Sequence, residues 1–172
     1  MKTTRHMSPP PAAKPKATAS LHAEHGKLLA TIHALGERLE KLHENPTLEQ
    51  MSMARDVVEF VKRQFVPHAR AEEYSLYPAA DWAAGEGAKL TEIARFEHQL
   101  VGRRLEALEK AISQGAPPGK LMHLSYGLLG LVAAHFTATD EVVLPYLDKA
   151  FDPERFEQEV LSPLRAERAA KR

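Results

Sequence analysis

Four of the nine histidines stand in helical seams whose other positions are mostly aliphatic: His25, His68, His98 and His135. Imidazole nitrogens coordinate iron, zinc and other transition metals, so several of them directed into one interior predict a metal site. Without a shared partner, each polar group left unpaired in an aliphatic core would cost about 1–3 kcal/mol. The alternative is four separate core histidines, each bonded to a carbonyl. One histidine in each of four predicted helices favours the metal site.

The sequence around these histidines is repeated. Glu-His pairs at 24–25 and 97–98 open similar apolar stripes. His68 and His135 are each followed, ten residues later, by a proline. The first half of the chain therefore resembles the second, and a bundle built from two such helical hairpins can bring all four histidines to one level.

Two carboxylates accompany the histidines. Glu72 follows His68 by four residues, so both project from the same helical face. Asp140 follows His135 by five residues and reaches the interior only if the helix is overwound or bulged there, as happens at functional sites. Nitrogen and oxygen ligands without cysteine suit iron, manganese or zinc. Six candidates exceed the four ligands of a structural zinc site, which favours two metal ions.

The other histidines fall outside these seams, in the N-terminal segment or on outer faces of the predicted helices: His6, His22, His33, His43 and His123. Among them, His22 lies one turn before His25 and could contact the site.

Positioning these side chains requires helices. Apolar residues recur at spacings of three and four, which predicts long helices over residues 20–44, 47–84, 88–114 and 120–150. Ser20 is a suitable N-cap for the first helix, and prolines 67 and 78 predict kinks in the second. Asp152 and Pro153 are typical of the start of a short C-terminal helix. We therefore expect an all-α fold, an antiparallel up-and-down four-helix bundle, with a disordered N-terminal tail.

The expected organisation has three parts. Residues 1–19 are rich in proline, alanine and lysine and form the tail, residues 20–151 form the bundle, and residues 152–172 form a short helix packed on or capping it.

Composition narrows the function classes. The lack of cysteine excludes disulfides, iron–sulfur clusters and thiol nucleophiles. Lysine plus arginine (23) equals aspartate plus glutamate (23), which gives no reason to expect nucleic-acid or anionic-membrane binding. No apolar run approaches the length of a bilayer span and no signal-peptide pattern begins the chain, so we expect no membrane association and a cytoplasmic location.

The motifs resemble those of the hemerythrin/HHE cation-binding family. They are Ala23-Glu24-His25, His68 to Pro78 (HARAEEYSLYP), Phe96-Glu97-His98, and His135 to Pro145 (HFTATDEVVLP). The resemblance covers roughly residues 20–150. It implies a centre of two non-haem iron ions with an oxo or hydroxo bridge, and Glu72 and Asp140 as bridging carboxylates. It also implies a small ligand such as O2, NO or peroxide.

One departure from the family pattern concerns the third helix. Oxygen-carrying members place two histidines one turn apart there, whereas the positions four residues from His98 are Ala94 and Gly102. The set becomes His25 with His68 on one iron, and His98 with His135 on the other. A position is left for water, an exogenous ligand, or one of these side chains: His22, Tyr74, Tyr77, Tyr126 or Tyr146.

The departure weakens the case for plain reversible oxygen carriage. We expect a hemerythrin-like di-iron protein that coordinates a small ligand for sensing, storage or detoxification, with manganese or zinc as alternative metals. A di-iron enzyme with catalase-like or NO-reducing activity is the first alternative, and a metal-free helical interaction module is the second.

Overall fold

The described chain is entirely helical outside its turns and loops. The computed structural model describes residues 16–42 and 47–170, and no strand occurs within these ranges. The all-α prediction is confirmed for this part of the chain. The predicted tail lies almost wholly outside the described residues.

Two of the long helical segments form the first half of the chain. The first is α1 (Ala19–Lys41). The second runs without interruption through five consecutive pieces: α2 (Thr47–Phe60), η1 (Val61–Phe65), α3 (Val66–Ala71), η2 (Glu72–Leu76) and α4 (Tyr77–Ala84).

The second half contains two more long segments and a shorter one. The third segment is α5 (Glu92–Ser113). The fourth is α6 (Pro118–Ala138), η3 (Thr139–Val143) and α7 (Leu144–Ala150). The chain then continues through α8 (Pro153–Phe156), η4 (Glu157–Leu161) and α9 (Ser162–Ala170).

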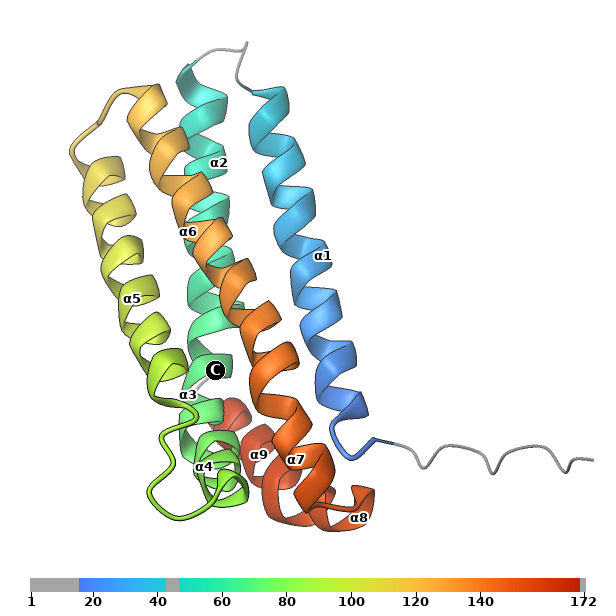
Figure 1. Ribbon diagram of the computed structural model, residues 1–172. Helices are drawn as coiled ribbons and strands as arrows, with labels where there is room; N and C mark the ends of the chain where they lie inside the picture. Colours follow the sequence, from blue (N-terminus) through green and yellow to red (C-terminus); the bar gives the residue numbers. More distant parts are fainter. Residues whose placement is uncertain (1–15, 43–46, 171–172) are drawn as a thin grey trace, which may run out of the picture.

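The four long segments lie side by side, and Figure 1 shows successive ones running in opposite directions. α6 packs against α1, α2 and α5, and α2 also packs against α5. The C-terminal helix α9 packs across α3 and η2, near the level at which the second long segment carries His68.

Apolar faces at helical spacing explain the packing. On α1 the predicted face is buried at six positions, namely Leu21, His25, Leu28, Ile32, Leu35 and Leu39. On α6, Leu124 and Leu131 are only half-buried, whereas Leu129 and Val132 are buried. α6 has neighbours on several sides, so its buried surface is wider than one stripe.

The histidines form a polar layer between two apolar clusters. On α1, His25 lies between Leu21 of one cluster and Leu28 of the other. On α5, His98 lies likewise between Ala94 and Val101. The apolar side chains above and below thus fix the level at which the imidazoles meet.

Each π-helical turn, η1 to η4, is followed by a proline at the second residue of the next α-helical piece: Pro67, Pro78, Pro145 and Pro163. Proline donates no N–H, and its ring clashes with the carbonyl four residues earlier in a regular helix. A wider turn before the proline accommodates both effects. At prolines 67 and 78, where the sequence predicts kinks, the helix contains a π-helical turn just before the proline. The turns at Glu72 and Thr139 also alter which residues share a face with His68 and His135.

Two helix starts differ from the prediction. Thr18, not Ser20, is the N-cap of α1, and both its N–H and its hydroxyl donate to Asp148 Oδ1 at 3.0 and 2.9 Å. α5 starts at Glu92 rather than residue 88, because Asp81 binds the N–H and hydroxyl of the N-cap Thr91. The predicted cap at Asp152 is confirmed by its hydrogen bond from the N–H of Arg155, at 2.9 Å.

The segment Pro118–Ala150 is long and apolar enough to cross a membrane, with a mean hydropathy of 1.3 in its most apolar window. The expectation that no segment would reach that length is therefore wrong. This segment packs against α1, α2 and α5 and carries His135 into the interior, as expected of a central helix. Length and composition alone are thus weak evidence for a membrane span.

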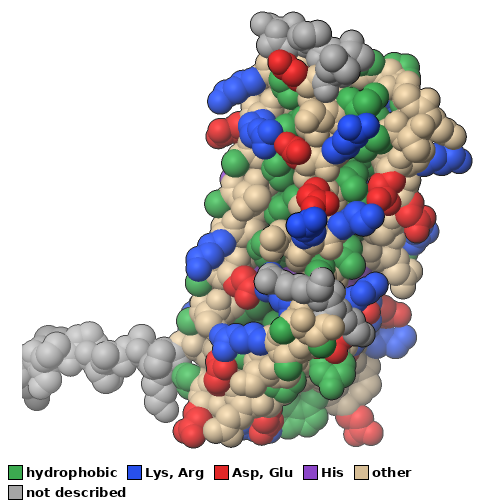
Figure 2. Space-filling view, turned by 180° about the vertical axis from the view of Figure 1, so that it is seen from behind, with side chains coloured by type: hydrophobic (Ala, Val, Ile, Leu, Met, Phe, Trp, Pro, Cys, Tyr) green, Lys and Arg blue, Asp and Glu red, His purple; other side chains and the backbone are tan. Residues whose placement is uncertain are grey.

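Acidic and basic side chains are interspersed on the face shown in Figure 2, without a large area of one sign. That face gives no support to binding of a polyanion.

Candidate metal centre

Five side chains from all four long segments converge at one level. α1 contributes His25, the second segment contributes His68 and Glu72, α5 contributes His98 and α6 contributes His135. His25, His68, Glu72 and His135 have no exposed side-chain surface, and the side chain of His98 is only 6% exposed. The structure therefore brings together five of the six ligands predicted from the sequence.

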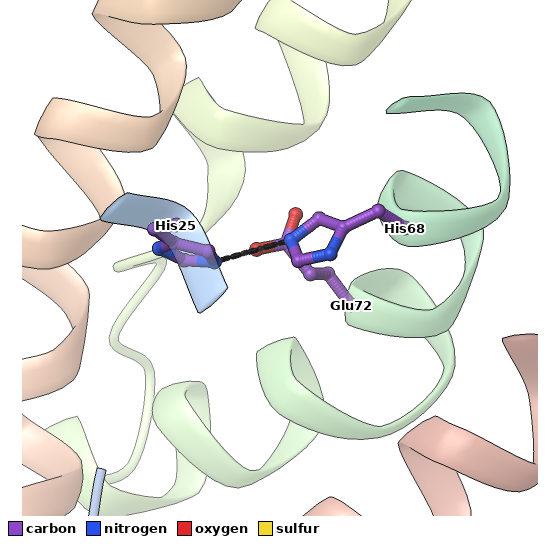
Figure 3. A group of neighbouring side chains, drawn as sticks. All are labelled: His25, His68 and Glu72. Carbon is purple, nitrogen blue, oxygen red and sulfur yellow. Dashed lines mark hydrogen bonds and ion pairs between the residues drawn. The ribbon is translucent and has the colours of Figure 1, made fainter. Parts of the chain in front are cut away.

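The carboxylate of Glu72 joins two groups of ligand atoms. One group is His25, His68 and Glu72, and the other is Glu72, His98 and His135; within each group the ligand atoms lie within 4.8 Å of one another. Figure 3 shows His25 and His68 facing each other from opposite helices with the Glu72 carboxylate beside them. Each group holds two imidazoles and one carboxylate oxygen.

The two oxygens of Glu72 divide between the groups. Oε1 lies 3.7 Å from His25 Nε2 and 3.2 Å from His68 Nε2. Oε2 lies 3.2 Å from the Nε2 atoms of both His98 and His135. A carboxylate in this position can bridge two cations, one at each oxygen.

Each of the four imidazoles has a carboxylate at its outer nitrogen, Nδ1. The pairs are His25 with Asp140 (2.6 Å), His68 with Glu24 (3.2 Å), His98 with Glu73 (2.8 Å) and His135 with Glu97 (3.0 Å). Such a carboxylate accepts a hydrogen bond from Nδ1–H, which fixes the tautomer and leaves the Nε2 lone pair as the ligand. All four Nε2 atoms are the inward ones.

The interior consequently has more acceptors than donors. The Nε2 atoms of His25 and His68 are 3.1 Å apart, and those of His98 and His135 are 3.2 Å apart. Glu72 Oε1 is buried without a hydrogen-bond partner. Imidazole lone pairs that face one another and a carboxylate repel each other. A cation placed between these atoms is instead coordinated by the nitrogens and the carboxylate oxygen together. The donor set, imidazole nitrogen with carboxylate oxygen, fits iron, manganese or zinc.

The pKa values of Glu72 and His135 reflect this crowding of acceptor atoms. Burial alone would raise the pKa of Glu72, but the charge of His68 and the close approach of the Nε2 atoms of His135, His68 and His98 lower it well below its ordinary value. Burial would lower the pKa of His135, but hydrogen bonds and charge interactions with Glu72 and Glu97 raise it to about 9. A proton on His135 therefore offsets part of the negative charge of Glu72 and Glu97, and a cation coordinated by the Nε2 atom of His135 would have to displace that proton.

Phenylalanine rings enclose the imidazoles. The ring of Phe136 lies 5.0 Å from His25 and 5.3 Å from His68, between ring centres. Phe65 lies 5.7 Å from His98 and 5.5 Å from His135. Both phenylalanines are buried. Two buried apolar rings therefore line the nitrogen ligands.

Asp140, the sixth predicted ligand, lies on the outer side of His25. Its Oδ1 faces His25 Nδ1, and its Oδ2 is 2.6 Å from Nδ1 of the exposed His22. The helix is irregular over Thr139–Val143, as the sequence requires if Asp140 is to turn inward, and the resulting contact is with a ligand histidine. Coordination of a metal by Asp140 stays a prediction.

The remaining predicted positions divide clearly. His33 and His123 are exposed, whereas His6 and His43 lie outside the described residues. Of the tyrosines proposed for the open coordination position, Tyr74, Tyr126 and Tyr146 are exposed and Tyr77 is fully buried at the site.

The sequence predicted no role at the site for three carboxylates. The side chain of Glu73 is 44% exposed, yet its Oε1 lies 2.8 Å from His98 Nδ1. Glu24 lies within hydrogen-bond distance of His68, and Glu97 of His135, so each contacts a histidine of a neighbouring helix rather than of its own. Glu24 also forms an ion pair with Arg168 of α9. The repeated Glu-His pairs were the signal that could have identified both.

Comparison with known families agrees with this geometry. The family profile of the hemerythrin HHE cation-binding domain matches residues 16–147. The chain belongs to this family. The match spans α1 through most of α7 and includes every residue of the two ligand groups. No curated protein and no solved structure matches the hemerythrin-family chain. The cation-binding description fits an interior that has more acceptors than donors.

Proposed function

We propose that this hemerythrin-family chain is a non-haem di-iron protein that coordinates a small ligand such as O2, NO or peroxide. In this proposal residues 20–151 form an antiparallel up-and-down four-helix bundle around the metals, and residues 152–172 cover it. The contact of Arg168 with Glu24 supports that covering role. Sensing, storage and detoxification are the uses that such binding serves.

The single observation that carries the proposal is the position of Glu72. Its two oxygens face two separate histidine pairs, so one buried carboxylate serves two cations. A structural site for one zinc ion would need four ligands around one point. Two imidazoles and one oxygen in each group leave coordination positions open, as a ligand-binding centre requires.

The proposed ligands are His25, His68, Glu72, His98 and His135. Iron bound by them would supply Lewis-acid and redox chemistry. Five carboxylates lie at or next to the imidazoles and balance the charge of two cations: Glu24, Glu72, Glu73, Glu97 and Asp140. The four outer ones keep each imidazole oriented with Nε2 inward.

Burial and the apolar wall favour a small ligand. His25, His68 and His135 are closed off from solvent, and Phe65 and Phe136 pack against the rings. Among the five proposed ligands, His98 alone has any exposed side-chain surface (6%), and its partner Glu73 is 44% exposed. A molecule of two or three heavy atoms therefore has its shortest approach beside His98, whereas a larger substrate would require helices to separate.

Iron-loaded protein and optical spectroscopy test the proposal. The full chain is loaded with Fe(II) without oxygen, desalted, and recorded before and after addition of O2, NO or peroxide. Saturable spectral changes with at least one ligand, at stoichiometric iron, support it. Protein that retains no iron, and is not stabilised by iron, overturns it in favour of a metal-free helical module. Steady-state turnover of peroxide or NO above that of free iron would assign the centre to catalysis.

A further inference from the structure

Tyr77 is a buried tyrosine whose hydroxyl lies among the ligand atoms. Its Oη is 3.1 Å from Glu72 Oε2 and 3.1 Å from His98 Nε2, and the residue has no exposed surface. These two atoms belong to the ligand group of Glu72, His98 and His135. The phenol oxygen therefore adds a fourth donor atom to that group.

The local fold explains how Tyr77 reaches the centre. The π-helical turn Glu72–Leu76 separates Tyr77 from Glu72 by five residues, and the N–H of Tyr77 donates to the carbonyl of Glu72. Residues five apart share a face in such a turn, which a regular helix does not allow. The proline that follows Tyr77 fits this wider turn.

The ring of Tyr77 is held from two directions. It stacks on His98, with ring centres 5.4 Å apart and planes inclined by 21°. The guanidinium of Arg95 lies 5.0 Å from the ring centre. Both neighbours come from α5, the helix that lacks a second ligand histidine. The hydroxyl is thus preorganised toward the ligand atoms on that side.

The internal repeat shows that a hydroxyl at this place is not needed for packing. Tyr77 lies nine residues after His68, and the residue nine after His135 is Leu144, which is also buried. An aliphatic side chain fills the corresponding position in the second half. The Tyr77 hydroxyl, which has no counterpart on Leu144, is directed at Glu72 and His98.

One phenol proton does not satisfy its surroundings. The hydroxyl can donate to Glu72 Oε2 or to His98 Nε2 but not to both. In the tautomer whose Nδ1–H donates outward to Glu73, Nε2 of His98 is an acceptor. Three acceptor atoms, the Tyr77 hydroxyl oxygen, Glu72 Oε2 and His98 Nε2, then share the single proton of the phenol. A cation at this point is coordinated by the same atoms.

We propose that Tyr77 is a metal ligand, binding through its phenolate oxygen the ion held by His98 and His135, in the position for which α5 supplies no second histidine. This inference rests on the proposed di-iron function. The phenol O–H bond breaks as the metal–oxygen bond forms, and the proton leaves to solvent, as expected for a ligand that must be deprotonated. The hard oxygen donor suits Fe(III).

The competing side chains are unsuited to this position. Tyr74, Tyr126 and Tyr146 are 64, 39 and 39% exposed. His22 is 69% exposed, and its Nδ1 pairs with Asp140 on the far side of His25. Only Tyr77, among these alternatives, has its polar atom within hydrogen-bond distance of a ligand group.

The test is the visible absorption and resonance Raman spectrum of the oxidised iron protein. Full-length protein is loaded with Fe(II), freed of excess iron and oxidised with ferricyanide. The wild type is expected to show a phenolate-to-Fe(III) charge-transfer band and enhanced tyrosinate ring vibrations. Tyr77→Phe should lose both while retaining its iron, and Tyr74→Phe, which changes an exposed tyrosine of the same segment, should keep both. A merely structural hydroxyl would give neither signal in any of the three proteins.

Iron content measured on the same samples separates this inference from the proposed function. Two iron ions per wild-type chain without a tyrosinate signal overturn the role of Tyr77 and leave the di-iron function intact. Wild-type protein without bound iron overturns both. If Tyr77→Phe folds poorly, the signal is assigned to Tyr77 when Tyr74→Phe, Tyr126→Phe and Tyr146→Phe all keep it, and its loss in any one of these three overturns the role of Tyr77.

Discussion

Glu73 and Asp140 make the same contact in the two halves of the site. Each lies five residues after a ligand histidine of its own helical segment, and each binds Nδ1 of a histidine on a different helix. Glu73 Oε1 is 2.8 Å from His98, and Asp140 Oδ1 is 2.6 Å from His25. The counterpart of Glu72 in the second half is Thr139, whose buried hydroxyl has no hydrogen-bond partner. The two halves of the repeat therefore share the outer carboxylates Glu73 and Asp140, whereas only the first half supplies the central carboxylate, Glu72.

This equivalence predicts similar effects of Glu73→Gln and Asp140→Asn. Both should lower iron affinity about 10- to 100-fold, as loss of a carboxylate that orients a ligand histidine does. At saturating iron both should still hold two ions per chain, measured by metal analysis after desalting. If Asp140→Asn alone holds a single ion, Asp140 turns inward and is itself a ligand.

Removing a ligand histidine should have a larger effect. His68→Ala or His135→Ala deletes one of two imidazoles in a group, so we expect iron content to fall to one ion per chain or less. His33→Ala and His123→Ala change exposed residues and serve as matched controls. Equal loss of iron in all four variants would show that the histidine seams are assigned wrongly.

Proton binding at His135 predicts how the stability of the metal-free protein depends on pH. The folded-state pKa, about 9, lies above the ordinary 6.5, because burial is outweighed by Glu72 and Glu97. The resulting stabilisation, on the order of 3 kcal/mol, is complete below pH 6.5 and lost as pH rises through about 9. Glu72 stays ionised over this range, since its pKa is lowered.

Thermal unfolding between pH 6 and 10 measures that dependence. The Tm of metal-free wild type should fall with rising pH, and His135→Gln should show a weaker dependence. Iron affinity should rise over the same interval, because the proton no longer competes. A Tm of the wild type that falls no more than that of the variant would contradict the assignment of this proton to His135.

Phe136 links the apolar core to the imidazoles. It is fully buried and its ring contacts those of His25, His68 and His135. Phe136→Ala should destabilise the metal-free protein by about 3–5 kcal/mol through lost burial and the cavity left behind. Phe96→Ala, at a 51% exposed position, should change stability by about 0.5 kcal/mol. Urea unfolding of both variants tests this, and equal effects would place Phe136 outside the core.

The sequence identified residues whose place follows from helical period. His25, His68, Glu72, His98 and His135 interrupt apolar stripes, and a stripe must face the interior. Glu24 and Glu97 were not recognised because each projects beside a stripe and acts on the neighbouring helix. Their role depends on how helices are rotated against one another, which the period of one helix does not determine.

Other features depended on contacts between segments. The start of α5 is fixed by Asp81, which belongs to the preceding helical segment, so local sequence placed it too early. The direction of Asp140 depends on the π-helical turn at Thr139–Val143. Four tyrosines could be considered for the open position from sequence alone, and only their burial in the folded chain distinguishes Tyr77.

The central claim is that one buried carboxylate, Glu72, joins two metal ions. Its most direct test is the amount of iron per chain in wild type and in Glu72→Gln, after loading with Fe(II) and desalting. We predict two ions in the wild type and at most one weakly held ion in the variant, whose amide cannot bridge as a carboxylate does. One ion or none in the wild type, or two firmly held ions in Glu72→Gln, would contradict the account.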